Sequence, residues 1–211
     1  MSNFVNTVDV VGDEVLTDSI IDRSITEIAD DTVTSIGDNA FCGCGSLTSV
    51  DFPNAETIGT ESFSGCASLT TVNFPVATKI GSNAFNGCTS LTAVKFPAVT
   101  SIVNNGFQGC SALVTADFPA ATNLASGAFN NCYALTALIL RNESTVCTMA
   151  TTSALQSTPI LGGTGYVYVP RALVDTYKAA TNWSTVGAQI RALEDYTVDG
   201  TTTGALDPTK I

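Results

Sequence analysis

Residues 80–97 read IGSNAFNGCTSLTAVKFP, and the same pattern returns every 22 residues without an insertion or deletion. The recurring positions include an isoleucine, a phenylalanine, a cysteine, a leucine and, in most copies, a closing Phe-Pro pair. Such a period predicts an array of stacked units rather than an ordinary globular domain. The phenylalanines and cysteines that mark it are Phe41, Phe63, Phe85, Phe107 and Phe129, and Cys44, Cys66, Cys88, Cys110 and Cys132.

Each unit combines a strand pattern with a return segment. Val50 and Phe52 lie two residues apart and therefore face one side of an extended chain, and Ser49 and Asp51 face the other. The I-G-x-x-A-F segment is expected to bring the chain back through a turn or a short helical segment. Its glycines allow backbone conformations that other residues resist. They are Gly37, Gly59 and Gly81.

One such unit cannot bury its own apolar face, whereas stacked units share a continuous core. We therefore expect a solenoid whose strands form a parallel β-sheet, at about 4.8 Å per coil. A degenerate first coil begins near Ser24, and the regular period ends after Leu140. Ala154-Leu155 resembles a further Ala-Phe pair, and Tyr166–Pro170 resembles a last strand. About six coils are expected.

These boundaries divide the chain into four segments. Residues 1–23 form an amino-terminal cap, expected as a β-hairpin, and residues 24–170 form the solenoid. Residues 171–196 form a helical carboxy-terminal cap, because terminal repeats need a cover, and residues 197–211 form a polar tail. Trp183 is expected to anchor the cap. The cap is expected to have two helical faces, one with Leu173, Val174, Tyr177 and Ala180 and one with Val186, Ile190 and Leu193.

Composition excludes several classes of protein. The net charge is −11 with eight scattered Lys and Arg, so no basic stripe is available for nucleic acid. No apolar run approaches the ~18 residues of a membrane-inserted helix. Residues 1–40 contain nine acidic residues, which we interpret as a solubilising end. A calcium site is the alternative, although no EF-hand spacing occurs there.

The sequence also predicts no enzyme and no cofactor. It has no histidine, which excludes Ser-His-Asp and Cys-His catalysis and every histidine-bearing metal site. No phosphate-binding loop and no G-x-S-x-G motif occurs. The carboxylate pairs Asp30-Asp31 and Glu194-Asp195 are interpreted as solvated surface rather than a glycosidase dyad.

The seven cysteines have a structural interpretation. Five form one rung per coil, where Cys serves as a small apolar core residue, and we expect free thiols. Disulfide geometry would tolerate neighbouring rungs, but five cannot all pair. Cys42, in Cys42-Gly43-Cys44, and Cys147 lie outside the ladder. Metal binding by the C-x-C pair is the alternative, without a second pair to complete it.

The unit I-G-x-x-A-F-x-G-C-x-x-L-x-x-V-x-F-P closely resembles the BspA-like leucine-rich repeats of bacteria, over roughly residues 24–170. Residues 166–183, YVYVPRALVDTYKAATNW, look like the element that often follows such repeats in gut bacteria. The resemblance implies a curved, right-handed leucine-rich-repeat solenoid with its parallel sheet on the concave face. It also implies a cell-surface or secreted protein that binds host proteins or glycans without enzyme activity.

The remaining candidate site is the concave face of the sheet, formed by the outward positions of the strands. Its positions are small, mostly polar and variable, whereas the inward positions repeat, and threonines such as Thr48 and Thr70 flank them. In solenoids such surfaces commonly bind partners, and plain solvated strand surface is the alternative. We predict that a protein or glycan partner docks across Asp51, Asn73, Lys95, Asp117 and Arg141.

Two functions are therefore carried forward. The first is a non-enzymatic binding or adhesion module. The second is a structural or receptor-binding component of a phage or prophage particle. Met1–Val10 shows neither the basic nor the apolar region of a signal peptide, which favours the second hypothesis.

Overall fold

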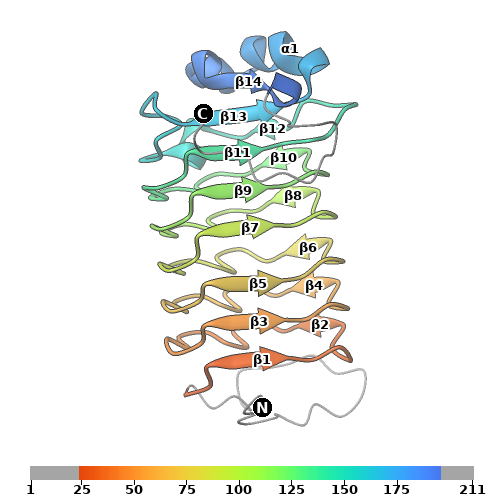
Figure 1. Cartoon of the computed structure of the whole chain (residues 1–211), viewed down its shortest axis with the longest axis vertical. Helices are drawn as coiled ribbons and strands as arrows, with labels where there is room; N and C mark the ends of the chain where they lie inside the picture. The colour runs from red at the N-terminus through yellow and green to blue at the C-terminus, as the bar shows by residue number, and fades with distance from the viewer. Residues whose placement is uncertain (1–23, 196–211) are drawn as a thin grey trace.

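The computed structural model describes residues 24–195, which form one stack of coils (Figure 1). The predicted amino-terminal hairpin in residues 1–23 and the polar tail in residues 197–211 lie outside the described residues. Each regular coil has three sides: a three-residue strand, a two-residue strand and a turn. The solenoid predicted from the period is confirmed.

The strands occupy two sides of every coil. In each three-residue strand the central residue points into the stack, as Val50 and Val94 do, because side chains alternate along a strand. Six successive pairs of strands confirm the expected number of coils. The three-residue strands are β1 (Glu27–Ala29), β3 (Ser49–Asp51), β5 (Thr71–Asn73), β7 (Ala93–Lys95), β9 (Thr115–Asp117) and β11 (Ala137–Ile139), followed by the four-residue β13 (Tyr166–Val169). The two-residue strands are β2 (Ser35–Ile36), β4 (Thr57–Ile58), β6 (Lys79–Ile80), β8 (Ser101–Ile102), β10 (Asn123–Leu124) and β12 (Thr148–Met149).

Neighbouring strands pair in parallel with a register of one repeat, so that Asp51 lies opposite Asn73 and Lys95 opposite Asp117. The predicted parallel pairing is confirmed, but it is interrupted once on each strand side. Within residues 24–195, the three-residue strands form the sheets β1-β3-β5 and β7-β9-β11-β13-β14, and the two-residue strands form β2-β4-β6 and β8-β10-β12.

The third side of each coil is a turn rather than a helix. Its hydrogen bonds span three residues, as from the N–H of Ala84 to the carbonyl of Gly81 at 3.2 Å. Further bonds join the turns of successive coils, as from the N–H of Phe63 to the carbonyl of Ala84 at 2.8 Å. Phe129 donates in the same way to Ala154, so the Ala154-Leu155 pair takes the expected place of the Ala-Phe pair.

The glycine after the isoleucine is needed for close stacking and not for a special backbone conformation, contrary to our expectation. A Cβ atom on Gly59 would lie 2.5 Å from the carbonyl carbon of Gly37, and one on Gly81 would lie 2.3 Å from the nitrogen of Thr60. Four glycines with positive φ stand just before ladder cysteines, as at Gly65, where φ is +74°. The first set therefore sets the spacing of coils, and the second set shapes the turn.

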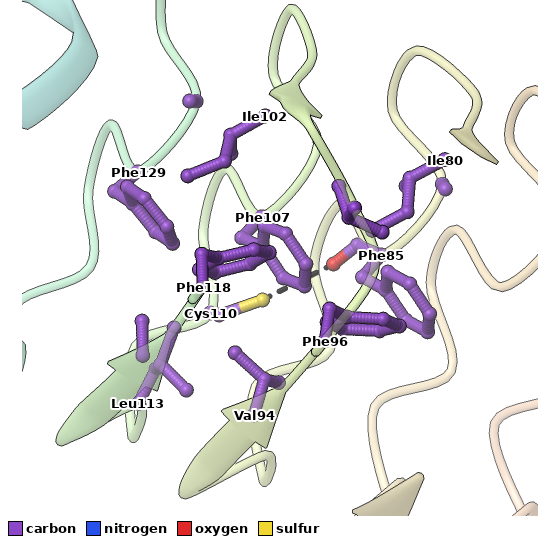
Figure 2. Packing of buried hydrophobic residues seen from close by; sticks show 14 of the residues in the cluster. Ile80, Phe85, Val94, Phe96, Ile102, Phe107, Cys110, Leu113, Phe118 and Phe129 are labelled. Atoms are coloured by element: carbon purple, nitrogen blue, oxygen red, sulfur yellow. Dashed lines mark hydrogen bonds between the residues drawn. The ribbon is translucent and has the colours of Figure 1, made fainter. Parts of the chain in front are cut away.

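Stacked phenylalanines form the core (Figure 2). The rings of Phe63 and Phe85 lie 5.3 Å apart between centroids, nearly parallel, and the rings of Phe85 and Phe107 lie 5.2 Å apart. The expected burial of the repeat positions is confirmed for all of these side chains. Val72 is an exception, because it is only half-buried where Val50, Val94 and Ala116 are buried.

The carboxy-terminal cap closes the stack, as predicted, and Trp183 anchors it. The indole nitrogen of Trp183 donates to the carbonyl of Cys147 at 2.6 Å, and the N–H of Cys147 donates to the hydroxyl of Tyr177 at 2.8 Å. The predicted second helical face is wrong at Ile190, because residues 190–192 form a strand that pairs with β13. The cap contains η2 (Arg171–Leu173), α1 (Val174–Ala179), η3 (Trp183–Gln189), β14 (Ile190–Ala192) and η4 (Leu193–Asp195); η1 (Thr152–Leu155) precedes β13.

Candidate functional site

The predicted site residues lie on what we call the outer strand face, the surface formed by the outward side chains of β1, β3, β5, β7, β9, β11 and β13. Asp51 and Asn73 occupy equivalent positions on adjacent strands, and so do Lys95 and Asp117. Arg141 lies two residues beyond β11 and reaches back to Asp117. The structure therefore places the five residues in two groups on either side of the junction between β5 and β7, which do not pair with each other. Asp51 and Asn73 form the first group, and Lys95, Asp117 and Arg141 form the second.

The first pair is open to solvent. The side-chain amide of Asn73 donates to the carboxylate of Asp51 at 2.7 Å. Both residues are exposed, and so is Lys95. Among the described residues no acidic side chain forms an ion pair with Lys95. This part of the face therefore presents an oriented carboxylate and an ammonium group, and both can contact a partner.

The second pair is partly shielded. The Arg141 guanidinium donates to both carboxylate oxygens of Asp117, with Nε 3.1 Å from Oδ1 and Nη2 3.3 Å from Oδ2. The side chains are only 21% and 10% exposed, respectively. Such a two-point bond fixes both groups and offsets their charges. Asp117 and Arg141 thus present a paired, locally neutral group to a partner rather than two separate charges.

Beyond this pair the outer strand face becomes apolar, contrary to the mostly polar surface predicted from the sequence. Ala137, Ile139 and Tyr168 form a small buried cluster, and Tyr166 and Leu193 pack against it. The signal was present in the sequence, since residues 137–140 are apolar without alternation, a pattern typical of a strand that is buried on both faces.

The threonines beside the face support the backbone. The hydroxyl of Thr48 donates to the carbonyl of Thr26 at 2.8 Å, and that of Thr70 donates to the carbonyl of Thr48 at 3.0 Å. Each hydroxyl thus ties one coil to the coil before it. Their recurrence reflects stacking, and it does not by itself mark a binding site.

Comparison with known proteins accounts for this architecture. The profile of the BspA type leucine rich repeat region matches residues 16–136 in six copies, which is more than half of the chain. This chain belongs to the BspA-type leucine-rich repeat family. A leucine-rich repeat protein from Bacteroides ovatus ATCC 8483 is similar at 28% identity, with a TM-score of 0.52, over 71% of this chain and 44% of that one.

Two further solved structures resemble this member of the BspA-type family. A leucine rich cell surface protein from Faecalibacterium prausnitzii A2-165 is 26% identical over 85% of this chain and 48% of its own, with a TM-score of 0.50. The pneumococcal vaccine antigen PcpA is 15% identical over 81% of this chain and 40% of its own, with a TM-score of 0.60, and shares the fold alone. The chain thus spans less than half the length of these three proteins. No protein of curated function is similar enough to add a relative.

The cysteine ladder of this BspA-type solenoid belongs to the core. The thiol of Cys110 donates to the carbonyl of Phe85 at 3.1 Å (Figure 2), and the thiol of Cys88 donates to that of Phe63 at 3.2 Å. Burial raises the pKa of Cys88, and a hydrogen bond with Cys132, together with burial, raises the pKa of Cys110. Neutral thiols that bond to backbone carbonyls explain why a cysteine recurs at this position.

Metal ions and membranes are two further classes of binding partner. The described residues contain no cluster of three or more His, Cys, Asp or Glu side chains that could hold a metal ion. Of the predicted C-x-C pair, Cys44 is buried in the core, while Cys42 is half-buried. The acidic residues before Ser24 lie outside the described residues. Within residues 24–195 no helix is long and apolar enough to cross a membrane.

Proposed function

We propose that this chain is a non-enzymatic binding or adhesion module, and that a protein or glycan partner docks on the outer strand face. The observation that carries the proposal is the exposed row Asp51, Asn73 and Lys95, held at equivalent positions on successive coils. Because each side chain of the row stands on a short strand, the row loses less conformational entropy on binding than a flexible loop would. The cell-surface protein of Faecalibacterium prausnitzii, with a similar solenoid, supports a role at a bacterial surface.

The chemistry of the row suggests a polar and salt-sensitive interaction. A carboxylate and an ammonium group lie on either side of an amide, so a partner with complementary charges or hydrogen-bonding groups fits best. Exposed charges of this kind are screened at high ionic strength. The alternative predicted from the sequence, a phage-particle component, draws no specific support from residues 24–195.

The test begins with a screen of the purified protein against host-surface proteins and a glycan array. Asp51→Ala, Lys95→Ala and Asp117→Ala are then combined, with Asn73 retained so that the sheet surface stays intact. We expect the Kd of the ligand found to rise at least about tenfold, which corresponds to about 1.4 kcal/mol.

A matched control removes charges from another side of the same stack of coils. Glu56→Ala with Lys79→Ala changes one exposed acid and one exposed base beside and within the two-residue strands. This control should leave Kd unchanged. Unchanged binding in the triple variant, or equal loss in the control, would place the site elsewhere.

A further inference from the structure

The hydrogen-bond ladder of the solenoid is interrupted between β5 and β7. At the neighbouring junctions the N–H of Phe52 donates to Asn73, and the N–H of Phe96 donates to Asp117, both at 3.0 Å. The described residues show no such bond from Phe74 to Lys95, and β5 and β7 are not paired. Figure 1 shows these two strands farther apart than their neighbours.

The second side of the same junction is open as well. Gly59 donates to Ile36 at 2.9 Å, Gly81 to Ile58 at 2.7 Å, and Ala125 to Ile102 at 2.8 Å. These three bonds join the two-residue strands at the junctions β2–β4, β4–β6 and β8–β10. The equivalent bond, from Val103 to Ile80, is missing from the described part of the chain.

The third side of the junction is closed. The N–H of Phe85 donates to Gly106, and that of Gly87 donates to Gln108, both at 2.8 Å. The rings in the core show the same asymmetry. The centroids of Phe85 and Phe107, beside the turn, lie 5.2 Å apart, no farther than those of the pairs before and after them. By contrast, the centroids of Phe74 and Phe96, beside the strands, lie 6.3 Å apart, against 5.7 Å for the pairs before and after them.

A change of residue type coincides with the opening. Gly37, Gly59 and Gly81 stack backbone on backbone, with no room for a Cβ between them. Val103 is the first residue with a side chain at this position, and it would have to stack on Gly81. Ala125 is the equivalent residue one coil later. Its N–H donates to Ile102, so the bond that is missing at Val103 is present again at the next junction. The interruption therefore follows the step from glycine to a branched side chain.

We propose that this junction is a hinge: the turn side holds the two halves of the solenoid together while the two strand sides open and close. The hinge lies between Asn73 and Lys95, inside the row to which we assign partner binding. Its opening changes the separation of these two side chains and so regulates the site. The hinge itself rests only on the geometry above; its effect on binding rests on the proposed function.

Amide hydrogen exchange of the full chain tests the hinge without a partner. In the unmodified protein the amides of Phe74 and Val103 should exchange faster than those of Phe52 and Ala125. Val103→Gly should close the ladder and slow exchange at Phe74 by about tenfold, the factor that one net hydrogen bond supplies. Ala125→Gly is the matched control, and it should leave exchange at Phe74 unchanged. Val103→Ala provides a second variant, with an intermediate effect.

Slow exchange at Phe74 in the unmodified protein, or no response to Val103→Gly, would overturn the hinge. With the ligand found in the screen, Val103→Gly should change Kd severalfold, whereas Ala125→Gly should not. If exchange responds but Kd does not, the hinge stands and its control of the site is rejected. Failure of the proposed binding site would show separately, in the triple variant.

Discussion

Ala93 in β7 and Ala137 in β11 occupy the same register position on the outer strand face, two coils apart, yet Ala93 is exposed and Ala137 is 2% exposed. Residue type and backbone position are the same, so the difference arises from the surroundings. The amino-terminal part of the face, from β1 to β7, is an open polar surface. The carboxy-terminal part, at β11 and β13, is a second small core.

The carboxy-terminal cap contributes to this difference. β14 extends the sheet beyond β13, and the guanidinium of Arg191 lies 4.6 Å from the centroid of the Tyr166 ring. Leu193, the residue directly after β14, packs against the cluster of Ala137, Ile139 and Tyr168. One continuous face of a solenoid can thus combine a surface suited to binding with a region that stabilises the fold.

The largest expected effect comes from placing a charge at the two matched alanines. Ala137→Lys puts an ammonium group into the buried cluster, so the free energy of unfolding should fall by about 3 kcal/mol or more. Ala93→Lys adds the same group to open surface and should change it by less than about 0.5 kcal/mol. Urea denaturation of both variants provides the measurement. Equal effects would show that the two parts of the face do not differ.

Much of this architecture follows from the sequence, and the exceptions have physical causes. The repeat identifies inward and outward positions because alternation along a strand is obligatory. The interruption of the hydrogen-bond ladder beside Val103 was not anticipated. The sequence alone does not distinguish a glycine required for close stacking of coils from one required for a positive φ angle. β14 was missed because Val186, Ile190 and Leu193 have helical spacing, and only contact with β13 favours a strand.

The candidate site was predictable to a smaller extent. The row Asp51, Asn73 and Lys95 follows from the period, since equivalent positions of a solenoid align. The contact between Asp117 and Arg141 does not, because residue 141 lies beyond the strand, where the repeat no longer fixes direction. The cover over Ile139 depends in part on Leu193, and no local pattern relates residues so far apart in sequence.

An intermediate effect is expected at the two aspartates of the outer strand face, Asp51 and Asp117. Asp117→Ala leaves the partly shielded Arg141 guanidinium without its acceptor and should lower the free energy of unfolding by about 1–3 kcal/mol. Asp51→Ala, on the open part, should change it by less than about 0.5 kcal/mol. Adding Arg141→Ala to Asp117→Ala should recover part of the loss, as a double-mutant cycle would show. A larger loss at Asp51 than at Asp117 would reverse the comparison.

The smallest effect concerns alkaline pH and the cap that closes the carboxy-terminal part. Burial raises the pKa of the Cys147 thiol from its ordinary value of 9.0 to about 12. The folded state therefore favours the neutral thiol, and unfolding releases its proton more readily. This stabilisation is fully present below about pH 9 and is lost as the pH rises toward 12. Between pH 9 and pH 10, unfolding should become easier by about 1 kcal/mol on account of this one group.

Cys147→Ala isolates that contribution, because Cys88 and Cys110 also have raised pKa values and remain in both proteins. Removing the thiol lowers stability at every pH through lost packing, but this offset does not depend on pH. The free energies of unfolding of the two proteins should therefore converge as the pH rises from 8 to 10.5 in a series of urea titrations. Parallel profiles would mean that the Cys147 thiol ionises in the folded protein as easily as in the unfolded chain, and that the cap does not exclude water from it.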